Sequence, residues 1–460
     1  MFAAKTYCAR RNLLKKQIQS GLIILFGNEE SPMNYTDNAY HFRQDSTFLY
    51  FFGLDSPGLA AVIDIDENRE IILGNELTID DIVWMGAQPS LAEKSLQVGV
   101  TETAPAAYLS EIINKALKGK KQIHFLPPYR PENKIKLYEL LGIVPARVKE
   151  AVSLELIRAV VAQRNFKSDE EINEIEKAAN ISVAMHVAAI KMAKPGMMER
   201  EIAAEVQRIV LANGGQIAFP IILTVNGQTL HNHDHGHTLK NGDMVLCDFG
   251  AETDLHYCAD LSSTFPVDSK FTARQREIYN ISLAAHNAAI AALKPGKKFK
   301  EVHLAACKRI AEGMRDLGLM KGNADDAVEA GAHAIFFPCG TGHLMGLDVH
   351  DMEDIGEMYV GYDGQPKSTQ FGLKSLRLAR ELQPGFVLTI EPGIYFIPEL
   401  IDKWRAEKRF NDFLDYQKLE AYKAFGGIRN EENFLITKEG CRLLGKEKPK
   451  SIEAVEALRR

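Results

Sequence analysis

The stretch LKNGDMVLCDFG, residues 239–250, sets the organisation of this sequence. An Asn-Gly pair precedes an apolar run, which ends in the carboxylate of Asp248 and a glycine. This order predicts a buried strand that delivers one charged side chain to a site at its end. The stretch LQPGFVLTIEPG, residues 382–393, repeats the order, because Glu391 follows Gly385 by six positions as Asp248 follows Gly242. Two buried acids at equivalent positions are costly unless positive charge lies between them, and a metal ion is the simplest candidate.

A longer repeat surrounds these two strands. NISVAMHVAAIKMAKPG at residues 180–196 and NISLAAHNAAIAALKPG at residues 280–296 share Asn, Ile, Ser, His, Ala-Ala-Ile and Lys-Pro-Gly at a constant offset of 100 positions. This period is far longer than the roughly 20–50 residues of a solenoid repeat. We therefore expect residues from about 168 to 445 to form two related halves, packed about a pseudo-twofold axis with a shared site. Ser168 followed by Glu171 predicts a capping box at the start of the first repeated helix.

The residues before this duplication predict a separate α/β domain, and we expect domains at residues 1–160 and 161–460. Apolar segments of strand length alternate there with segments of helical period. The predicted strands are 21–27, a run around Phe48 to Gly53, 59–65, 70–74 and 122–127, and the predicted helices are 7–19, 90–97, 108–117 and 131–141.

Composition argues against several classes of function. A hydrophobic content of 46% and a charged content of 25% are ordinary for a globular enzyme. The net charge of −6 argues against a nucleic-acid partner, and no segment reaches the roughly 20 apolar residues of a membrane span. The six cysteines lack CxxC spacing, which favours free thiols in a reducing compartment, and the N-terminal segment lacks the apolar core of a signal peptide. We therefore expect a cytoplasmic protein.

Each half offers a second acid. Asp260 follows Asp248 by 12 positions, which suits a hairpin that brings both carboxylates together, and Glu431 follows Glu391 in another strand-like segment. His343 lies between the halves, in FFPCGTGHLMGLDVHD. Four carboxylates carry too much negative charge for one ion but suit two divalent ions about 3.5–4 Å apart. Oxygen donors with one imidazole and no thiolate favour Mn²⁺, with Zn²⁺ and Co²⁺ as alternatives. Any single acid could instead cap a turn or pair with an arginine.

The motifs GDMVLCDFG, ADLSSTFP, GHLMGLDVHD, LARELQPGFVLTIEPGIYF and GGIRNEENFLIT resemble those of the pita-bread metallopeptidases. The resemblance is to the proline-specific branch, which contains prolidase (Xaa-Pro dipeptidase) and aminopeptidase P. HFRQDSTFLYFFG and VWMG resemble the N-terminal domain of that branch, so the likeness covers nearly all of the chain. It implies an α/β fold with an N-terminal α/β domain and a C-terminal pita-bread catalytic domain. The metal ligands that it implies are Asp248, Asp260, His343, Glu391 and Glu431.

The resemblance also implies roles in catalysis and substrate binding. His231 and His350 would stabilise the tetrahedral intermediate and hold the scissile carbonyl, and Arg429 matches an arginine next to the last ligand. Glu391 would also carry the proton to the leaving nitrogen. Arg377 matches a prolidase arginine that grips the free carboxylate of a dipeptide, a task that suits a guanidinium fork, although either arginine could be a structural ion pair.

Trp84 is one of two tryptophans, and its size predicts a place in the core. In relatives, however, the matching residue reaches the active site of a neighbouring subunit. That resemblance implies a homodimer or homotetramer in which Trp84 contributes to substrate binding.

The sequence departs from the family pattern near the site. Cys339 stands where the family usually has a histidine, and a thiol cannot donate as an imidazolium does. Ser262 replaces a threonine but keeps the hydroxyl, and the interval from Asp248 to Asp260 is one residue longer than usual. The segment HNHDHGH carries alternating histidines, which on a strand would share one face and could bind a separate metal. Its Asn, Asp and Gly residues favour a loop in which only His231 is functional.

We therefore expect a metallopeptidase that cleaves the Xaa-Pro bond at a peptide N-terminus, with prolidase-type cleavage of dipeptides favoured by Arg377. The first alternative is an aminopeptidase P that acts on longer peptides. A second alternative, from another class, is a metal-free pita-bread binding module, which the complete set of acids disfavours.

Overall fold

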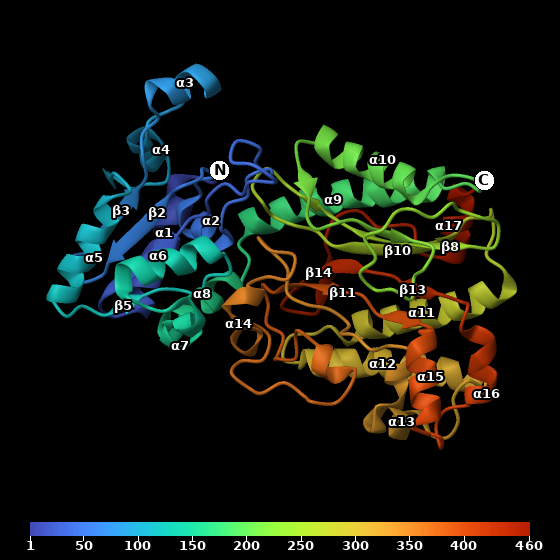
Figure 1. Cartoon of the computed structure of the whole chain (residues 1–460). Coiled ribbons are helices and arrows are strands. Elements are labelled where there is room, and N and C mark those ends of the chain that lie inside the picture. The colour runs from blue at the N-terminus through green and yellow to red at the C-terminus, as the bar shows by residue number, and fades with distance from the viewer. The chain divides into compact units, whose positions relative to one another are not determined.

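The computed structural model describes residues 1–460, which divide into two compact units (Figure 1). The first unit comprises residues 1–164 with 352–359, and the second comprises residues 165–351 with 360–460.

A five-stranded mixed sheet forms the centre of the first unit, in the order β4-β3-β2-β1-β5. The three middle strands pair antiparallel, whereas β5 and β4 pair in parallel with β1 and β3. Alternate side chains of these strands pack against α5, for example Ile24 and Val62 against Ile113. The strands are β1 (Leu22–Phe26), β2 (Ala60–Asp64), β3 (Arg69–Leu73), β4 (Glu102–Ala104) and β5 (Ile123–His124).

Helices surround this sheet, and the four predicted from the sequence are present with shifts of up to three residues at their ends. They are α1 (Ala4–Gln17), α4 (Leu91–Gln97), α5 (Tyr108–Lys118) and α6 (Pro131–Leu141). The unit also contains α2 (Ser46–Phe52), α3 (Ile79–Met85), η1 (Pro145–Arg147), α7 (Val148–Ala151) and α8 (Leu154–Arg164).

The prediction of a strand around Phe48 to Gly53 is wrong, because these residues form most of α2. The side chain of Asp45 accepts a hydrogen bond from the backbone N–H of Phe48, which caps the helix N-terminus. Gly53 ends the helix with a φ of 61°. Every residue of α2 is buried, so the segment has no polar face and its hydrophobic period cannot distinguish helix from strand.

Two long helices of the second unit correspond to the repeated sequence. The first is α9 (Asp169–Met192), whose predicted capping box between Ser168 and Glu171 is confirmed. The second is α11 (Ala273–Ala292), and each is followed by a partner helix, α10 (Glu199–Ala212) or α12 (Phe299–Asp316). The repeated histidines, His186 and His286, are both fully buried, and His186 Nε2 lies 3.1 Å from the carbonyl oxygen of Phe249 beside Asp248.

The strands of the second unit lie between the α9–α10 pair and the α11–α12 pair (Figure 1). One sheet has the order β10-β8-β7 and another has the order β11-β14-β15, while β12 pairs with β13 and β6 with β9. The backbone N–H of Glu431 donates to the carbonyl of Ser262 and so links the two halves at their central strands. The strands are β6 (Gln216–Ile217), β7 (Ile222–Thr224), β8 (Met244–Phe249), β9 (Ala251–Glu252), β10 (Leu261–Pro266), β11 (Val387–Ile390), β12 (Gly393–Tyr395), β13 (Gly427–Arg429), β14 (Glu432–Ile436) and β15 (Cys441–Leu443).

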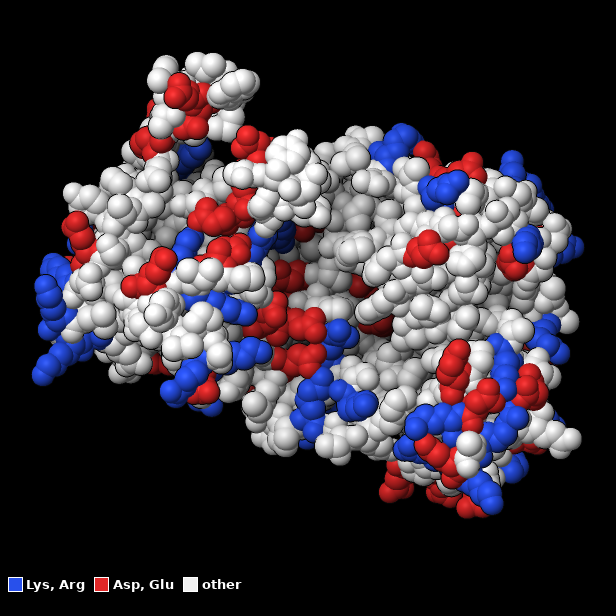
Figure 2. Space-filling view, viewed as in Figure 1, with Lys and Arg blue, Asp and Glu red and all other residues white.

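Shorter helices complete the chain, and acidic and basic side chains are interspersed over α15 and α16 (Figure 2). None of the helices is both long enough and apolar enough to span a lipid bilayer. These shorter helices are α13 (Ala324–Ala330), η2 (Ala332–Ile335), α14 (Glu353–Val360), η3 (Leu373–Ser375), α15 (Pro398–Ala406), α16 (Tyr416–Leu419), η4 (Glu420–Tyr422) and α17 (Ile452–Leu458).

Candidate active site

The first pair of acids lies at one end of the β8–β10 hairpin, as the sequence predicts. Asp248 on β8 lies opposite Ser262, and Asp260 immediately precedes β10. The residues between the strands include β9 and His256, whose φ of 67° turns the chain back. Both carboxylates line one cavity, although the interval between them is one residue longer than in the family pattern.

The second pair of acids occupies the equivalent position in the other half. Ile390 on β11 lies opposite Glu432 on β14, so Glu391 and Glu431 are the residues next to this pair. The two hairpins thus bring acids that are distant in sequence to a common cavity.

His343 joins the four carboxylates. Its Nε2 atom lies 3.4 Å from Asp260 Oδ2 and 3.4 Å from Glu391 Oε1. Its Nδ1 atom lies 3.1 Å from the carbonyl oxygen of Leu344, an acceptor that favours the proton on Nδ1. The lone pair of Nε2 then faces carboxylate oxygens, an arrangement that a cation between them makes favourable. One ligand atom each from Asp260, His343 and Glu431 lie within 4.8 Å of one another.

Buried oxygen atoms without a partner support the same conclusion. Asp248 Oδ1, Asp260 Oδ1 and Glu431 Oε1 are inaccessible to solvent and make no hydrogen bond within the protein. Burial and the neighbouring acids raise the pKa of Asp260 and of Glu431 well above the ordinary range, and burial raises the pKa of Glu391. Such carboxylates are ionised only where positive charge compensates them, so the donor set fits divalent cations.

Arg429 supplies part of that positive charge from the protein itself. The residue is 3% exposed, and its side chain donates to Asp248 Oδ2 at 2.5 Å, to Ser262 Oγ at 2.8 Å and to Tyr395 Oη at 2.8 Å. Ser262 in turn donates to Glu431 Oε2 at 2.7 Å. The hydroxyl kept at position 262 therefore connects Arg429 to an acid of the other hairpin.

Sequence reasoning missed Thr389 and Asn433, which hold the acids in place, and Tyr395, which accepts a hydrogen bond from Arg429. Thr389 Oγ1 donates to Glu391 Oε1 at 3.3 Å and accepts from the His343 N–H at 3.1 Å. Asn433 exchanges two hydrogen bonds with the backbone of Asp260, at 3.2 and 2.6 Å. Thr389 and Asn433 each lie two positions from an acid, and the twofold period of a strand could have indicated them. Tyr395 had no comparable signal.

The cavity around these acids has a volume of about 260 Å³. Phe219, Pro220 and Ile222 form part of an apolar wall. All the predicted site residues of the second unit contribute to its lining, namely His231, Asp248, Asp260, His343, His350, Arg377, Glu391, Arg429 and Glu431.

Trp84 is a different case. It lies on α3 of the first unit with 86% of its surface exposed, so the prediction that it packs in the core is wrong. The buried tryptophan is Trp404, which is 1% exposed.

The two histidines predicted to contact substrate lie at the cavity, and the His350 ring packs edge-on against that of His343, with 4.4 Å between their centroids. Burial, together with the charges of Arg429 and Arg377, lowers the pKa of His231, which favours its neutral form. Cys339 also lines the cavity, where burial and Glu391 raise the pKa of its thiol to about 12. The thiol therefore stays protonated near neutral pH.

The histidine-rich segment forms a loop and does not gather its rings into one site. His235 Nε2 lies 3.1 Å from the carbonyl oxygen of Ile221, and His237 Nδ1 lies 3.0 Å from Glu199 Oε2. His231 and His233 line the cavity instead. The loop interpretation is therefore confirmed, with His233 as a second cavity residue that the sequence did not indicate.

Comparison with known proteins identifies the family. The model of metallopeptidase family M24 matches residues 173–438, and the model of the aminopeptidase P N-terminal domain matches residues 7–124. The chain belongs to metallopeptidase family M24. The predicted family, the mixed α/β fold and the pita-bread catalytic domain are therefore confirmed.

Relatives within the M24 family span almost the whole chain. The Xaa-Pro dipeptidase of Homo sapiens is 33% identical over 460 residues, covering 96% of this chain and 89% of the relative. A probable Xaa-Pro aminopeptidase of Aspergillus niger is 32% identical over 478 residues, covering 99% and 97%. The structure of zinc-substituted E. coli aminopeptidase P in complex with product superposes with a TM-score of 0.82 at 27% identity, covering 99% of this chain and 98% of that chain.

Proposed function

We propose that this chain hydrolyses the bond between an N-terminal residue and a following proline, with dipeptides as preferred substrates. The relatives named Xaa-Pro dipeptidase and Xaa-Pro aminopeptidase support the proline specificity. The observation that carries the preference for dipeptides is Arg377, a guanidinium in the lining of the acid-rich cavity. The cavity volume of about 260 Å³ lies just below the usual range for ligand pockets, roughly 300–1,000 Å³, and suits a small substrate.

In this proposal the site binds two divalent metal ions. Mn²⁺ is the favoured ion, because oxygen atoms dominate the set of ligand atoms. When bound, such ions lower the pKa of a water molecule toward neutrality and polarise the substrate carbonyl. The proposed ligands are Asp248, Asp260, His343, Glu391 and Glu431.

The remaining residues of the cavity bind and orient the peptide. Neutral His231 and neighbouring His350 hold the scissile carbonyl and stabilise the oxyanion. Glu391, whose pKa is raised by burial, carries a proton to the imino nitrogen of the leaving proline. Arg429 orients Asp248 through its hydrogen bond and balances the negative charge.

A side-by-side assay with Mn²⁺ tests the substrate class. We expect the dipeptides Gly-Pro and Ala-Pro to be cleaved with a higher kcat/KM than a tripeptide Ala-Pro-Xaa, because only a dipeptide places its free carboxylate beside Arg377. Equal or faster cleavage of the tripeptide would instead support the aminopeptidase alternative, which the A. niger relative and the E. coli structure favour.

Arg377 variants test the same idea residue by residue. Arg377→Ala should raise KM for dipeptides far more than for tripeptides, and Arg377→Lys should restore part of the loss. Arg380→Ala is the matched control, since Arg380 lies on the same segment and donates to the Val360 carbonyl at 3.2 Å. A loss of equal size on both substrates would remove Arg377 from its proposed role.

The metal-free binding module is not proposed, because the chain belongs to a peptidase family and keeps the full set of acids.

We also propose that the protein forms a homo-oligomer through α3. Its residues Ile79, Val83, Trp84 and Met85 are 58–86% exposed, which leaves an apolar surface that a second copy can cover. Trp84 would then belong to the substrate site of a neighbouring subunit. Light scattering should give a mass of two or four chains for the native protein and a smaller mass for Trp84→Asp; a native monomer would contradict the proposal.

We place the domains at residues 1–160 and 161–460, which the compact units support.

A further inference from the structure

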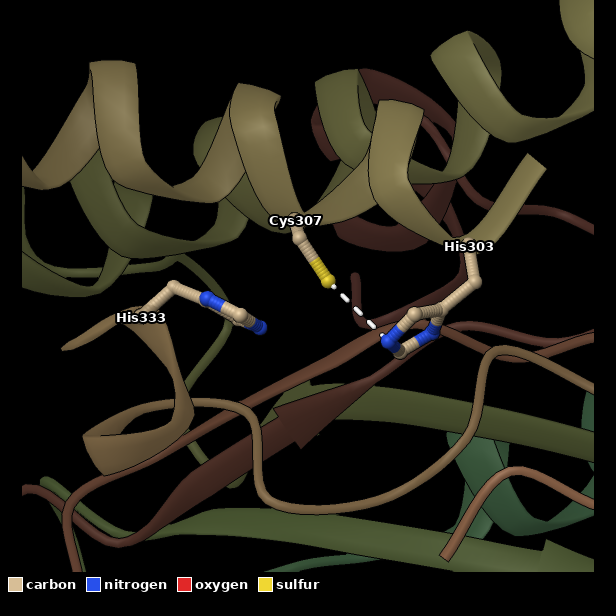
Figure 3. Close-up of side chains that lie close together, drawn as sticks. All are labelled: His303, Cys307 and His333. Carbon is tan, nitrogen blue, oxygen red and sulfur yellow. Dashed lines mark hydrogen bonds between the residues drawn. The ribbon is translucent and has the colours of Figure 1, made fainter. Parts of the chain in front are cut away.

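A second group of metal-binding side chains lies buried in the same unit, outside the set of acids. It consists of His303 and Cys307, one turn apart on α12, and His333 on η2 (Figure 3). One ligand atom from each residue lies within 4.8 Å of the others, and all three side chains are fully buried. Figure 3 shows the Cys307 thiol between the two imidazole rings, so the side chains of α12 and η2 converge on one point.

The two residues on α12 already have the orientation that a metal ligand needs. Cys307 Sγ lies 3.3 Å from His303 Nε2, and His303 Nδ1 lies 2.9 Å from the hydroxyl oxygen of Thr341. With bonds of about 2.3 Å to sulfur and about 2.0 Å to nitrogen, a tetrahedral zinc ion separates its ligand atoms by roughly 3.5 Å. The Thr341 hydroxyl oxygen can accept the proton of the far ring nitrogen, as a carboxylate, a carbonyl or a water molecule does for most metal-bound imidazoles.

No hydrogen bond of ordinary geometry accounts for the buried ring of His333. Both of its ring nitrogens are buried and make no hydrogen bond of ordinary geometry. Burial lowers the pKa of His333 to about 4, although the carbonyl of Ala327 opposes the shift, and burial lowers the pKa of His303 to about 3. Both rings are therefore neutral, which is the form that binds a metal. An unpaired imidazole in an apolar core is costly, and an aliphatic side chain would serve better if packing were its only role.

We propose that His303, Cys307 and His333 supply three of the four ligands of a structural metal ion of the zinc class. One thiolate and two imidazoles are donors for Zn²⁺ or Co²⁺ and are unlike the oxygen-rich set at the cavity. The thiolate forms when the metal ion binds and displaces the thiol proton, which passes to solvent. Because the folded site is fully buried, the ion enters while the chain folds.

This site would also stabilise the chain segment that carries His343 to the cavity. Thr341, which holds the His303 ring, also accepts a hydrogen bond from the backbone N–H of Glu391 at 2.8 Å and lies two residues before His343. An ion that fixes α12 to η2 would therefore also fix the segment that carries His343.

Cobalt substitution tests the proposal without depending on activity. The full chain is produced in zinc-depleted medium with Co²⁺ and dialysed against a chelator, which removes ions from the open cavity more readily than from an enclosed site. We expect about one equivalent of retained cobalt and a near-ultraviolet thiolate-to-cobalt absorption band. Cys307→Ser should abolish the band and the retained cobalt, while Cys441→Ser, the matched thiol control, should keep both. Asp260→Asn should also keep both, because it alters only the acid set.

Two further outcomes decide the assignment. A band that survives Cys307→Ser but disappears in Cys339→Ser would overturn the proposal, because the thiolate would then belong to the cavity. Failure of the native protein to retain cobalt would overturn it as well. If Cys307→Ser does not fold, His333→Phe supplies the test, since a phenyl ring fills the same apolar space without a ligand atom. That variant should fold and lose the retained cobalt; retention would contradict the site.

Discussion

Arg429 holds three side chains at the active site, since its guanidinium donates to Asp248, Ser262 and Tyr395. Arg429→Lys keeps the charge but cannot donate in three fixed directions. We expect that variant to lose about 10²-fold or more in kcat, because misplacing a catalytic group by about 1 Å has that effect. Tyr395→Phe removes one acceptor only and should lose far less, as steady-state kinetics of the two variants will show. Comparable losses would mean that the Tyr395 contact, and not the fork geometry, positions Asp248.

Lys448 gives a test that depends on pH. It is buried, and its Nζ donates to the Ser262 carbonyl at 2.7 Å and to Ser263 Oγ at 2.8 Å. Burial lowers the pKa of Lys448 from 10.5 to about 8. Between these values the unfolded chain binds more protons at this residue than the folded protein does, so its contribution to stability increases as pH rises. The cost of burying the ammonium is fully present below about pH 8 and amounts to about 3 kcal/mol.

The comparison is between the native protein and Lys448→Met, measured by urea unfolding with chelator present. From about pH 7.5 to about pH 10, the native protein should gain about 2–3 kcal/mol relative to the variant. Parallel pH profiles for the two proteins would show that Lys448 titrates as it does in the unfolded chain.

At the scale of the element, local signals in the sequence sufficed where a cap or a turn decided the structure. Ser168 marks the start of α9. The apolar runs that end in Asp248 and Glu391 indicated two strands, with Asp248 the penultimate residue of β8 and Glu391 directly after β11. The same reasoning failed for α2, because its seven residues are buried on every side and carry no period. Contacts between distant segments had no local signal at all, as His333 beside Cys307 and Tyr395 beside Arg429 illustrate.

Two glycines that end helices test how far such local rules hold. Gly53 after α2 and Gly142 after α6 both have left-handed backbone, with φ of 61° and 69°. A Cβ at Gly53 would lie 2.2 Å from Cζ of Tyr7, whereas a Cβ at Gly142 would meet no atom within 4 Å. Gly142→Ala should therefore cost only the backbone strain, about 1–2 kcal/mol. Gly53→Ala should cost clearly more in urea unfolding, and equal costs would show that Tyr7 moves aside freely.

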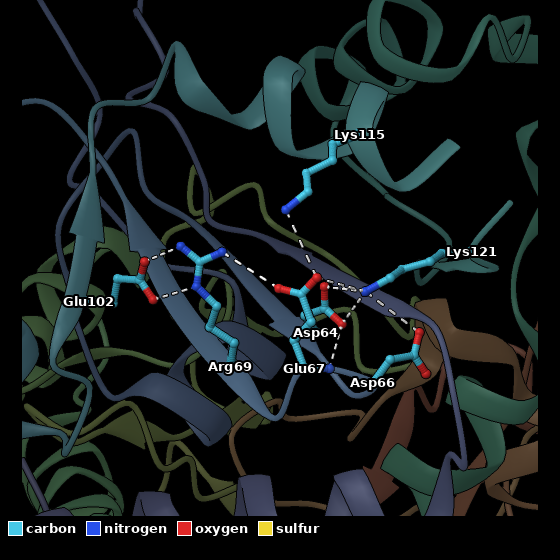
Figure 4. Close-up of polar contacts among 7 residues, drawn as sticks. All are labelled: Asp64, Asp66, Glu67, Arg69, Glu102, Lys115 and Lys121. Carbon is cyan, nitrogen blue, oxygen red and sulfur yellow. Dashed lines mark hydrogen bonds and ion pairs between the residues drawn. The ribbon is translucent and has the colours of Figure 1, made fainter. Parts of the chain in front are cut away.

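At the scale of the whole molecule, the stability of the two units depends on different electrostatic interactions. The second unit gathers buried acids around one cavity, and its stability should depend on divalent cations. The first unit carries a partly exposed network at the β2–β3 turn, in which Lys121 Nζ lies 2.7 Å from Asp64 Oδ2 and 3.5 Å from Glu67 Oε1 (Figure 4). The network comprises Asp64, Asp66, Glu67, Arg69, Glu102, Lys115 and Lys121. Pairs of this kind contribute up to about 1 kcal/mol each and are screened by salt.

Calorimetry can separate the two dependences, because each unit has its own apolar core and should give its own transition. Excess Mn²⁺ should raise the transition temperature of the second unit alone. Its free energy of unfolding should increase by about 2.7 kcal/mol when the ion is at 100 times its Kd. Asp260→Asn should abolish that increase, while added NaCl should lower the transition of the first unit slightly in both proteins. An increase that persists in Asp260→Asn would place the stabilising ion elsewhere, and a single transition that shifts as a whole would show that the units unfold together. The unit that needs cations for stability is then also the unit whose acids bind them for catalysis, since uncompensated buried carboxylates cost free energy in the same cavity where they hold the metal.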